Sequence, residues 1–224
     1  MQQHYYYHKL YPLQDKVLRH IEEVNQAFYL SGGTALSRQY LQHRFSDDLD
    51  FFTNQNPDFQ KEVEKIIKHL SAKFKLEIST LDQSFVRIFI VENEVSLKLE
   101  WINDVAYSFG EKKQCELFHR LDNWQNILSN KLSALSRNEP KDISDILFIC
   151  KKFEFSWAEV IYQAKEKDMW VEEIEISRTI MNLPINSLEK VNWAISPNYE
   201  ELENLKKAIA FDIISGKNNR THAV

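Results

Sequence analysis

The sequence has few cysteines and few glycines, and it contains no long apolar run. Its 224 residues include only Cys115 and Cys150, too few for a disulfide framework and not spaced as metal ligands. No stretch approaches the ~20 apolar residues of a transmembrane helix, and the first residues lack a secretory signal. We therefore expect a cytoplasmic protein with ordinary thiols and no membrane partner.

An excess of basic charge is also absent, since 28 Lys and Arg against 33 Asp and Glu give a formal net charge of -5 at pH 7. This balance argues against indiscriminate binding to nucleic acid, and we expect no DNA partner. A local basic groove for RNA stays compatible with it, because a field depends on how charges are distributed as well as on their sum.

Hydrophobic periodicity divides the chain into two halves of different character. The first half alternates helices with strands that show a period of two. Its expected helices cover 13–25, 34–41 and 57–70, and its expected strands 27–30, 49–53, 74–80, 85–91 and 95–102. The second half is helical throughout, over 124–136, 140–153, 157–167, 169–183 and 199–214. We predict an α+β fold: a mixed sheet with flanking helices in a domain of residues 1–118, then a helical domain of residues 119–224.

Two of the four glycines stand side by side, Gly32 and Gly33, between an expected strand and an expected helix. Glycine lets backbone N–H groups approach a ligand closely, and a helix N-terminus favours anions. Ser31 and Thr34 add hydroxyl groups on either side. This layout is typical of a phosphate cradle, although a tight connection without any ligand gives the same pattern.

Three acids fall on polar faces of expected strands. Asp48 and Asp50 are two residues apart, so their side chains share one face, ~6.6 Å apart along the strand. Glu100 lies on the polar face of the strand around residues 95–101, together with Lys98. Three carboxylates from neighbouring strands suggest a cation site. The alternative is that Asp48 and Asp50 are solvated at a strand end and that Lys98 and Glu100 are an exposed face.

The helical half contributes a second charged group. Lys131 lies on one expected helix, and Asp142 and Asp145 share a face of the next at i, i+3. A plain interpretation is also open, in which Asp142 favours the helix N-terminus and Lys141 pairs with Asp145.

Taken together, these residue types fit one chemistry. Clustered oxygen ligands suit a hard cation, above all Mg²⁺, with Mn²⁺ as a substitute. Two such ions can hold an attacking hydroxyl and a leaving pyrophosphate. With a glycine turn for the phosphates and a lysine to neutralise charge, the set predicts metal-dependent nucleotidyl transfer from an NTP.

The segment SGGTALSRQYLQHRFSDDLDFF resembles the signature of the AbiEii-type nucleotidyltransferase toxins, within the DNA-polymerase-β-like superfamily. The matching residues are Gly32, Gly33, Thr34, Ala35, Leu36, Arg44, Ser46, Asp48, Leu49, Asp50 and Phe51. A second segment, LSNKLSALSRNEPKDISDILFI, resembles the family's lysine helix and following acids through Lys131, Arg137, Lys141, Asp142 and Asp145. Lys98-Leu99-Glu100 fits the strand motif between them. The resemblance implies the nucleotidyltransferase fold.

The resemblance also implies roles. Asp48, Asp50 and Glu100 would bind the metal, and Glu100 would help to activate the acceptor hydroxyl. The triphosphate would be held by Ser31, Gly32, Gly33, Thr34 and Arg44, and its charge would be neutralised by Lys131. Asp145 would orient Lys131 or the nucleotide, and Arg44 could instead make a structural salt bridge.

A toxin of this kind would belong to a type IV toxin–antitoxin or abortive-infection (phage-defence) system and would act with a separately encoded antitoxin. Its acceptor would be tRNA, another RNA or a protein. Two alternatives keep the fold: a catalytically inactive binding or regulatory module, and a small-molecule, antibiotic-modifying nucleotidyltransferase.

Overall fold

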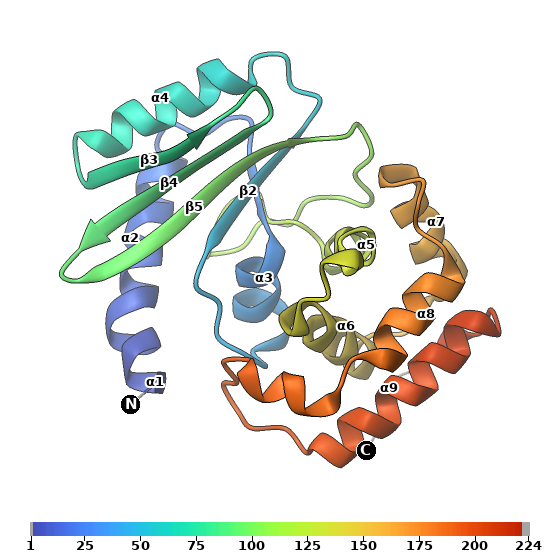
Figure 1. Ribbon diagram of the computed structural model, residues 1–224. Coiled ribbons are helices and arrows are strands. Elements are labelled where there is room, and N and C mark those ends of the chain that lie inside the picture. Colours follow the sequence, from blue (N-terminus) through green and yellow to red (C-terminus); the bar gives the residue numbers. More distant parts are fainter. Residues whose placement is uncertain (1, 221–224) are drawn as a thin grey trace. The chain divides into compact units, whose positions relative to one another are not determined.

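A computed structural model of the protein describes residues 2–220, which fall into two compact units (Figure 1). The first unit runs to Gln39 and resumes over Phe45–Asn123. The second consists of Tyr40–Arg44 and the chain from Trp124 onward. The units thus divide after residue 123, where the sequence suggested 118, and five residues from the first half belong with the helices.

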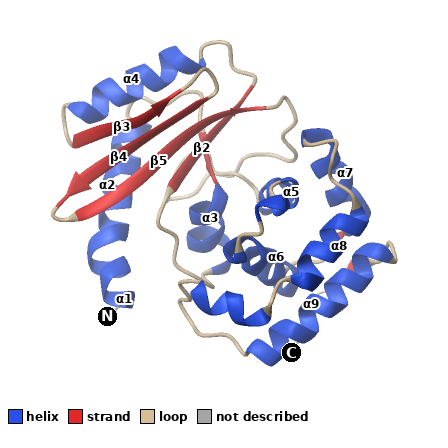
Figure 2. Ribbon diagram, in the orientation of Figure 1, coloured by secondary structure: helices blue, strands red, loops and turns tan. Residues whose placement is uncertain are grey.

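The first unit alternates helices with the strands of one sheet (Figure 2). Its helices are α1 (Gln2–Tyr5), α2 (Tyr11–Glu22), α3 (Gly32–Ala35) and α4 (Phe59–Ser71), with π-helical turns at Tyr6–Leu10 and Leu36–Leu41. Its strands are β1 (Tyr29–Ser31), β2 (Leu49–Asn54), β3 (Lys75–Leu81), β4 (Phe85–Glu92) and β5 (Val95–Asp104). The strand order is β1-β2-β5-β4-β3, in which β2 and β5 are parallel and the other neighbours antiparallel. The predicted mixed sheet with flanking helices is confirmed.

Alternation along β2 and β5 builds the core of this unit. Leu49 and Phe51 on β2 are fully buried, as are Leu99 and Trp101 on β5. The rings of Phe51 and Trp101 stack with their centroids 5.5 Å apart. Because successive strand residues point to opposite faces, burial of this set leaves Asp50 and Glu100 on the other face.

The hairpin between β4 and β5 turns through two residues, Asn93 and Glu94, both with positive φ. Positive φ at both central residues is what the twist of a two-residue hairpin requires. Asn tolerates this conformation, so the turn forms without glycine.

The N-terminal residues form helical turns that the sequence analysis did not predict. Tyr6 and Leu10 are buried, and the Tyr6 ring stacks on Phe45 with a centroid distance of 4.2 Å. The chain then continues into α2, which passes behind the strands in the view of Figure 1 and packs against α4. Aromatic packing rather than polar capping therefore holds this start of the chain.

The second unit is helical, as predicted. Its helices are α5 (Trp124–Ser133), α6 (Pro140–Lys152), α7 (Trp157–Lys167), α8 (Glu173–Asn182) and α9 (Tyr199–Ile214), with 3₁₀ turns at Leu135–Arg137 and Ile185–Lys190. The short strands β6 (Phe155–Ser156) and β7 (Asn218–Asn219) pair with one another. Helix α8 begins four residues later than predicted, because the Asp168 carboxylate accepts a hydrogen bond from the Trp170 backbone N–H, 3.0 Å away, and forms a turn.

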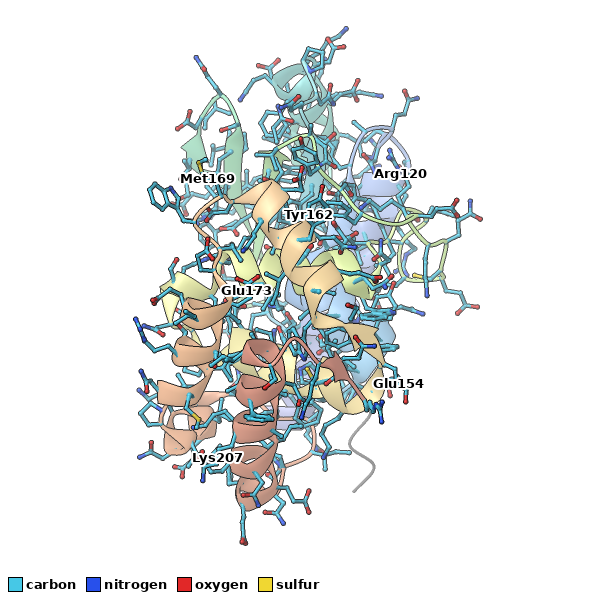
Figure 3. The ribbon with its side chains drawn as sticks, turned by 90° about the vertical axis from the view of Figure 1, so that its right-hand side faces the viewer. Arg120, Glu154, Tyr162, Met169, Glu173 and Lys207 are labelled. Atoms are coloured by element: carbon cyan, nitrogen blue, oxygen red, sulfur yellow. The ribbon has the colours of Figure 1, made fainter. Side chains whose placement is uncertain are left out.

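The surface of this unit carries apolar as well as charged side chains (Figure 3). Tyr162 on α7 and Met169 after it are 60% and 79% exposed. In the described part of the chain, none of the helices has the length and apolar character needed to cross a membrane.

Candidate functional site

The predicted carboxylates lie in a row of polar side chains that crosses the sheet of the first unit. Asp50 is the register partner of Ser31 on β1 and of Glu100 on β5. Glu100 is in turn the register partner of Arg87 on β4. Side chains at matching register on adjacent strands project from the same face. The fold therefore brings Asp50 and Glu100 together, with Asp48 two residues before Asp50.

Lys98 connects two of these acids. Its Nζ lies 2.9 Å from Asp48 Oδ2 and 3.1 Å from Glu100 Oε1. Burial alone would lower the pKa of Lys98, but the hydrogen bond and charge of Asp48, together with Glu100, outweigh burial and raise it. A positively charged ammonium group thus lies between two of the three predicted metal ligands.

Glu100 has a second cationic partner in Arg87. Arg87 Nε donates a hydrogen bond of 2.6 Å to Glu100 Oε1, the same oxygen that Lys98 contacts. Burial would raise the pKa of Glu100, but the charges and hydrogen bonds of Lys98 and Arg87 outweigh it and lower the pKa. Glu100 is therefore an anionic oxygen donor at neutral pH.

Gly32 lies directly against Asp50. The backbone of Gly32 has a φ of +66°, and a Cβ at this position would come within 2.3 Å of Asp50 Oδ2. Glycine adopts this conformation without steric cost, and no side chain would fit beside the carboxylate. Gly33 follows as the second residue of α3. The glycine pair thus permits the turn from β1 into α3 next to a predicted metal ligand.

The two hydroxyls beside the glycines are buried and donate within the protein. Ser31 Oγ donates to Asp122 Oδ2 at 2.6 Å, and Thr34 Oγ1 donates to the backbone carbonyl of Asp48 at 2.5 Å. Thr34 therefore fixes the chain just before β2, where Asp48 and Asp50 follow. Each hydroxyl has a single O–H donor, and in these hydrogen bonds it donates to an acceptor within the protein.

Asp122 is a buried acid that the sequence analysis missed. Its backbone N–H donates to the Leu30 carbonyl at 2.9 Å, so this segment runs beside β1. Its carboxylate is fully buried and accepts from Ser31 and from Lys112, whose Nζ lies 2.8 Å from Oδ1. Lys112 also lies 3.8 Å from the ring centroid of Tyr29. A single acid in a loop gives no periodic signal, so nothing in the local sequence indicates this partnership.

In the second unit Asp145 is the centre of a buried network. Arg44 donates to it twice, from Nε to Oδ1 at 2.7 Å and from Nη2 to Oδ2 at 2.8 Å. Lys131 Nζ lies 2.6 Å from Oδ2, and His43 Nε2 lies 2.7 Å from Oδ1. Arg44 therefore makes the salt bridge that the sequence analysis considered as one of its roles, and Asp145 holds Lys131 in place.

The charges of this network oppose its burial. Burial would raise the pKa of Asp145, but Arg44 and Lys131 outweigh it and hold the pKa well below the usual range. Burial would likewise lower the pKa of Lys131, which Asp145 and Asp142 raise. Burial lowers the pKa of His43 despite its hydrogen bond to Asp145. We infer a neutral His43 that donates from Nε2, whereas its buried Nδ1 makes no hydrogen bond.

Asp142, in the first turn of α6, is the second partner of Lys131, at 2.7 Å. Asp145 is paired with Arg44, His43 and Lys131, so the plain interpretation in which Lys141 neutralises Asp145 does not describe its contacts. His43 was missed because a lone histidine beside an arginine has no sequence signal of its own.

The predicted site residues thus belong to two groups. The first unit contains Ser31, Gly32, Gly33, Thr34, Asp48, Asp50 and Glu100, and the second contains Arg44, Lys131 and Asp145. Within the first group, Asp48, Asp50 and Glu100 supply oxygen ligands of the kind that Mg²⁺ prefers. The Lys98 ammonium between Asp48 and Glu100 indicates that this arrangement accommodates a cation.

Comparison with solved structures identifies the class of fold. A crystal structure from H. pylori, of a protein provisionally described as a nucleotidyltransferase, aligns with a TM-score of 0.65 and 19% identity over 91% of this chain and 94% of the other. The crystal structure of JHP933 from Helicobacter pylori aligns with a TM-score of 0.65 and 20% identity over 92% and 93%. The chain therefore has the predicted nucleotidyltransferase fold.

Sequence comparison then finds a family match over part of the chain. Residues 16–109 match the family described as "Nucleotidyl transferase AbiEii toxin, Type IV TA system". The predicted resemblance to AbiEii nucleotidyltransferases is confirmed over these residues, which include the glycine turn and all three carboxylates, whereas the second motif lies outside them. The protein aq_aa25 of Aquifex aeolicus (strain VF5) is 28% identical over 183 residues, which cover 80% of this chain and 84% of that protein.

Proposed function

We propose that this protein is a metal-dependent nucleotidyltransferase that transfers NMP from an NTP to an RNA, tRNA foremost, or to a protein. The observation that carries the proposal is the register of Asp50 with Glu100 on adjacent strands, next to Asp48 and against Gly32. The family match over residues 16–109 supports the reaction class and the role as toxin of a type IV toxin–antitoxin or abortive-infection system.

Asp48, Asp50 and Glu100 would hold Mg²⁺, or Mn²⁺ in its place. The donor set fits such an ion, because it consists of carboxylates around a position that a cationic side chain already approaches. When bound, the metal would neutralise charge on the phosphates and favour the ionised acceptor hydroxyl. The protein's own contribution is to orient the carboxylates through the strand register and through the Arg87–Glu100 hydrogen bond.

The backbone N–H groups of Gly32 and Gly33 would hold the triphosphate, where absence of side chains allows close approach. Ser31 and Thr34 would contribute to this pocket by fixing its walls. The resemblance also gives Lys131 the role of neutralising the charge of the triphosphate. The 2.6 Å contact of Lys131 with Asp145 supports the proposal that Asp145 orients it.

The proposed partners follow from the family. A cognate antitoxin protein would bind the toxin and suppress its activity. An experiment with labelled NTPs can identify the acceptor. RNA, protein and small-molecule drugs can be separated after the reaction, and the fraction that carries the label contains the acceptor.

The test incubates the purified protein with each labelled NTP and Mg²⁺, in the presence of total tRNA, cell protein or an aminoglycoside panel. The Asp50→Asn variant should lose transfer by about 10²-fold or more, because metal stabilisation of transition-state charge is worth several kcal/mol. Asp47→Asn is the matched control, since Asp47 adjoins the motif and accepts a hydrogen bond from the Tyr6 hydroxyl, 2.6 Å away. Equal transfer by Asp50→Asn and wild type would refute the enzyme proposal.

A second candidate, an inactive module with the same fold, is favoured by Lys98 lying between Asp48 and Glu100, where it satisfies both acids without a metal. That function predicts NTP binding by wild type without transfer to any acceptor. Label entering only the aminoglycosides would instead identify a small-molecule nucleotidyltransferase.

A further inference from the structure

Two histidines and a glutamate meet at the ends of α2 and α4, away in sequence from the carboxylates of β2 and β5. His20 lies in the last turn of α2, Glu23 directly follows that helix, and His69 lies in the last turn of α4. Figure 1 shows these two helices. His20 and Glu23 are three residues apart, the spacing that places side chains on one face of a helix. The packing of α2 on α4 then brings the third side chain to them.

The distances match those of a small metal site. His20 Nδ1 lies 3.1 Å from Glu23 Oε1, and His69 Nε2 lies 2.9 Å from Glu23 Oε2. One ligand atom from each of the three residues lies within 4.8 Å of the others. A tetrahedral Zn²⁺ bound at 2.0–2.1 Å separates its ligand atoms by about 3.3 Å. Small side-chain rotations would therefore suffice to close the site.

The Nε2 atom of His69 gives independent support. This atom is shielded from solvent and lies 2.9 Å from Glu23 Oε2, with which it forms an ion pair when His69 is protonated. The nitrogen therefore faces a carboxylate oxygen at a distance at which both atoms can bind one metal ion.

The electrostatic setting also favours a cation. The last turns of helices carry unsatisfied carbonyl groups, and the partial negative charge of α2 and α4 adds to that of Glu23. Glu23 is 52% exposed on its side chain, so an ion can enter from solvent. The ring of Phe74 lies edge-on to His20 at 5.6 Å and limits its movement.

We propose that His20, Glu23 and His69 form a zinc site with water as the fourth ligand. Imidazole ligands favour Zn²⁺, Cu²⁺ and Ni²⁺ over Mg²⁺, so this site differs in metal preference from the carboxylates of the proposed active site. By joining the ends of α2 and α4, the ion would stabilise the first unit without taking part in nucleotidyl transfer.

The test uses the full-length protein, stripped by chelation and titrated with Zn²⁺ in excess Mg²⁺, which occupies sites that prefer oxygen ligands. We expect one tight equivalent and a raised melting temperature. Glu23→Gln and His69→Gln should each weaken Zn²⁺ binding at least tenfold. Tetrahedral Co²⁺ absorption in wild type provides a readout that needs no variant.

Three controls separate the alternatives. His119→Gln removes an exposed histidine that pairs with Glu22 at 2.9 Å but belongs to no three-ligand group among residues 2–220, and it should leave binding unchanged. His8→Gln tests a separate histidine pair before the start of α2, His4 and His8, whose ring centroids lie 4.4 Å apart. Asp50→Asn should keep the zinc while losing transfer, so failure of the proposed function is distinguishable. Wild-type binding in His69→Gln, no zinc uptake by wild type, or loss of zinc in His8→Gln alone would each overturn the proposal.

Discussion

At the scale of single residues, the Asp50 carboxylate leaves no room for a side chain at position 32. Its φ of +66° alone favours glycine, but the stronger constraint is the Asp50 carboxylate, 2.3 Å from where a Cβ would lie. A substitution would therefore push the carboxylate out of the row that it forms with Glu100. Gly32 thus affects the proposed chemistry through position, without any chemistry of its own.

The Gly32→Ala variant should lose about 10²-fold in kcat/KM, because displacement of a catalytic group by about 1 Å has effects of that size. Gly216→Ala is the matched control, since Gly216 also has a positive φ, +62°, but has no atom of the described residues within 4 Å of its Cβ position. Gly216→Ala should lose only about 1 kcal/mol of stability and keep its activity. Equal activity of Gly32→Ala and Gly216→Ala would contradict the steric explanation.

Lys98 should compete with a metal for Asp48 and Glu100. Ion pairs in contact with solvent are worth about 1 kcal/mol, so Lys98→Met should lower the Mg²⁺ concentration for half-maximal activity about fivefold. Measurement of activity against Mg²⁺ concentration checks this, with Lys61→Met on the exposed face of α4 as control. A higher Mg²⁺ requirement in Lys98→Met would mean that the lysine supports the metal site.

At the scale of elements, the segment Tyr40–Arg44 is held by a loop and a helix of the second unit. The Ala194 N–H donates to the His43 carbonyl at 3.1 Å, and Arg44 forms a backbone bridge with Trp193. Arg44 and His43 also bind the buried Asp145 of α6. The arginine of the glycine–aspartate motif is therefore a structural anchor in this unit.

Asp145→Asn should destabilise the second unit by about 3–5 kcal/mol, because it leaves buried Arg44 and Lys131 without their shared anion. Asp142→Asn, which removes only one partner of Lys131, should lose about 1.5–3 kcal/mol. Urea unfolding followed by tryptophan fluorescence measures both, since four of the five tryptophans follow residue 123. An equal loss in the two variants would deny Asp145 its central role.

The pH dependence of this difference follows from the lowered pKa of Asp145. Its contribution to stability is fully present above the ordinary value of 3.8 and is lost as the pH falls through the lower folded-state pKa. The gap between wild type and Asp145→Asn should therefore persist at neutral pH and shrink only in strong acid.

At the scale of the whole molecule, the sequence predicted the sheet and the helical half because strands and helices bury residues at different periods. It also predicted that Asp48 and Asp50 share a face, since strand alternation is a local property, whereas Glu100 on another strand was added to them as a suggestion that the resemblance supported. Contacts such as Ser31–Asp122 and His43–Asp145 were not predicted. Their partners are 91 and 102 residues apart, and tertiary packing alone brings them together.

The path of the chain has a consequence for the evolution of its gene. Because Tyr40–Arg44 belongs to the second unit, the backbone passes from one unit to the other three times. A single recombination event that replaced the codons from Trp124 onward would therefore leave the five codons of Tyr40–Arg44 from the original second unit in place. The two units should consequently be inherited, and diverge, as a pair.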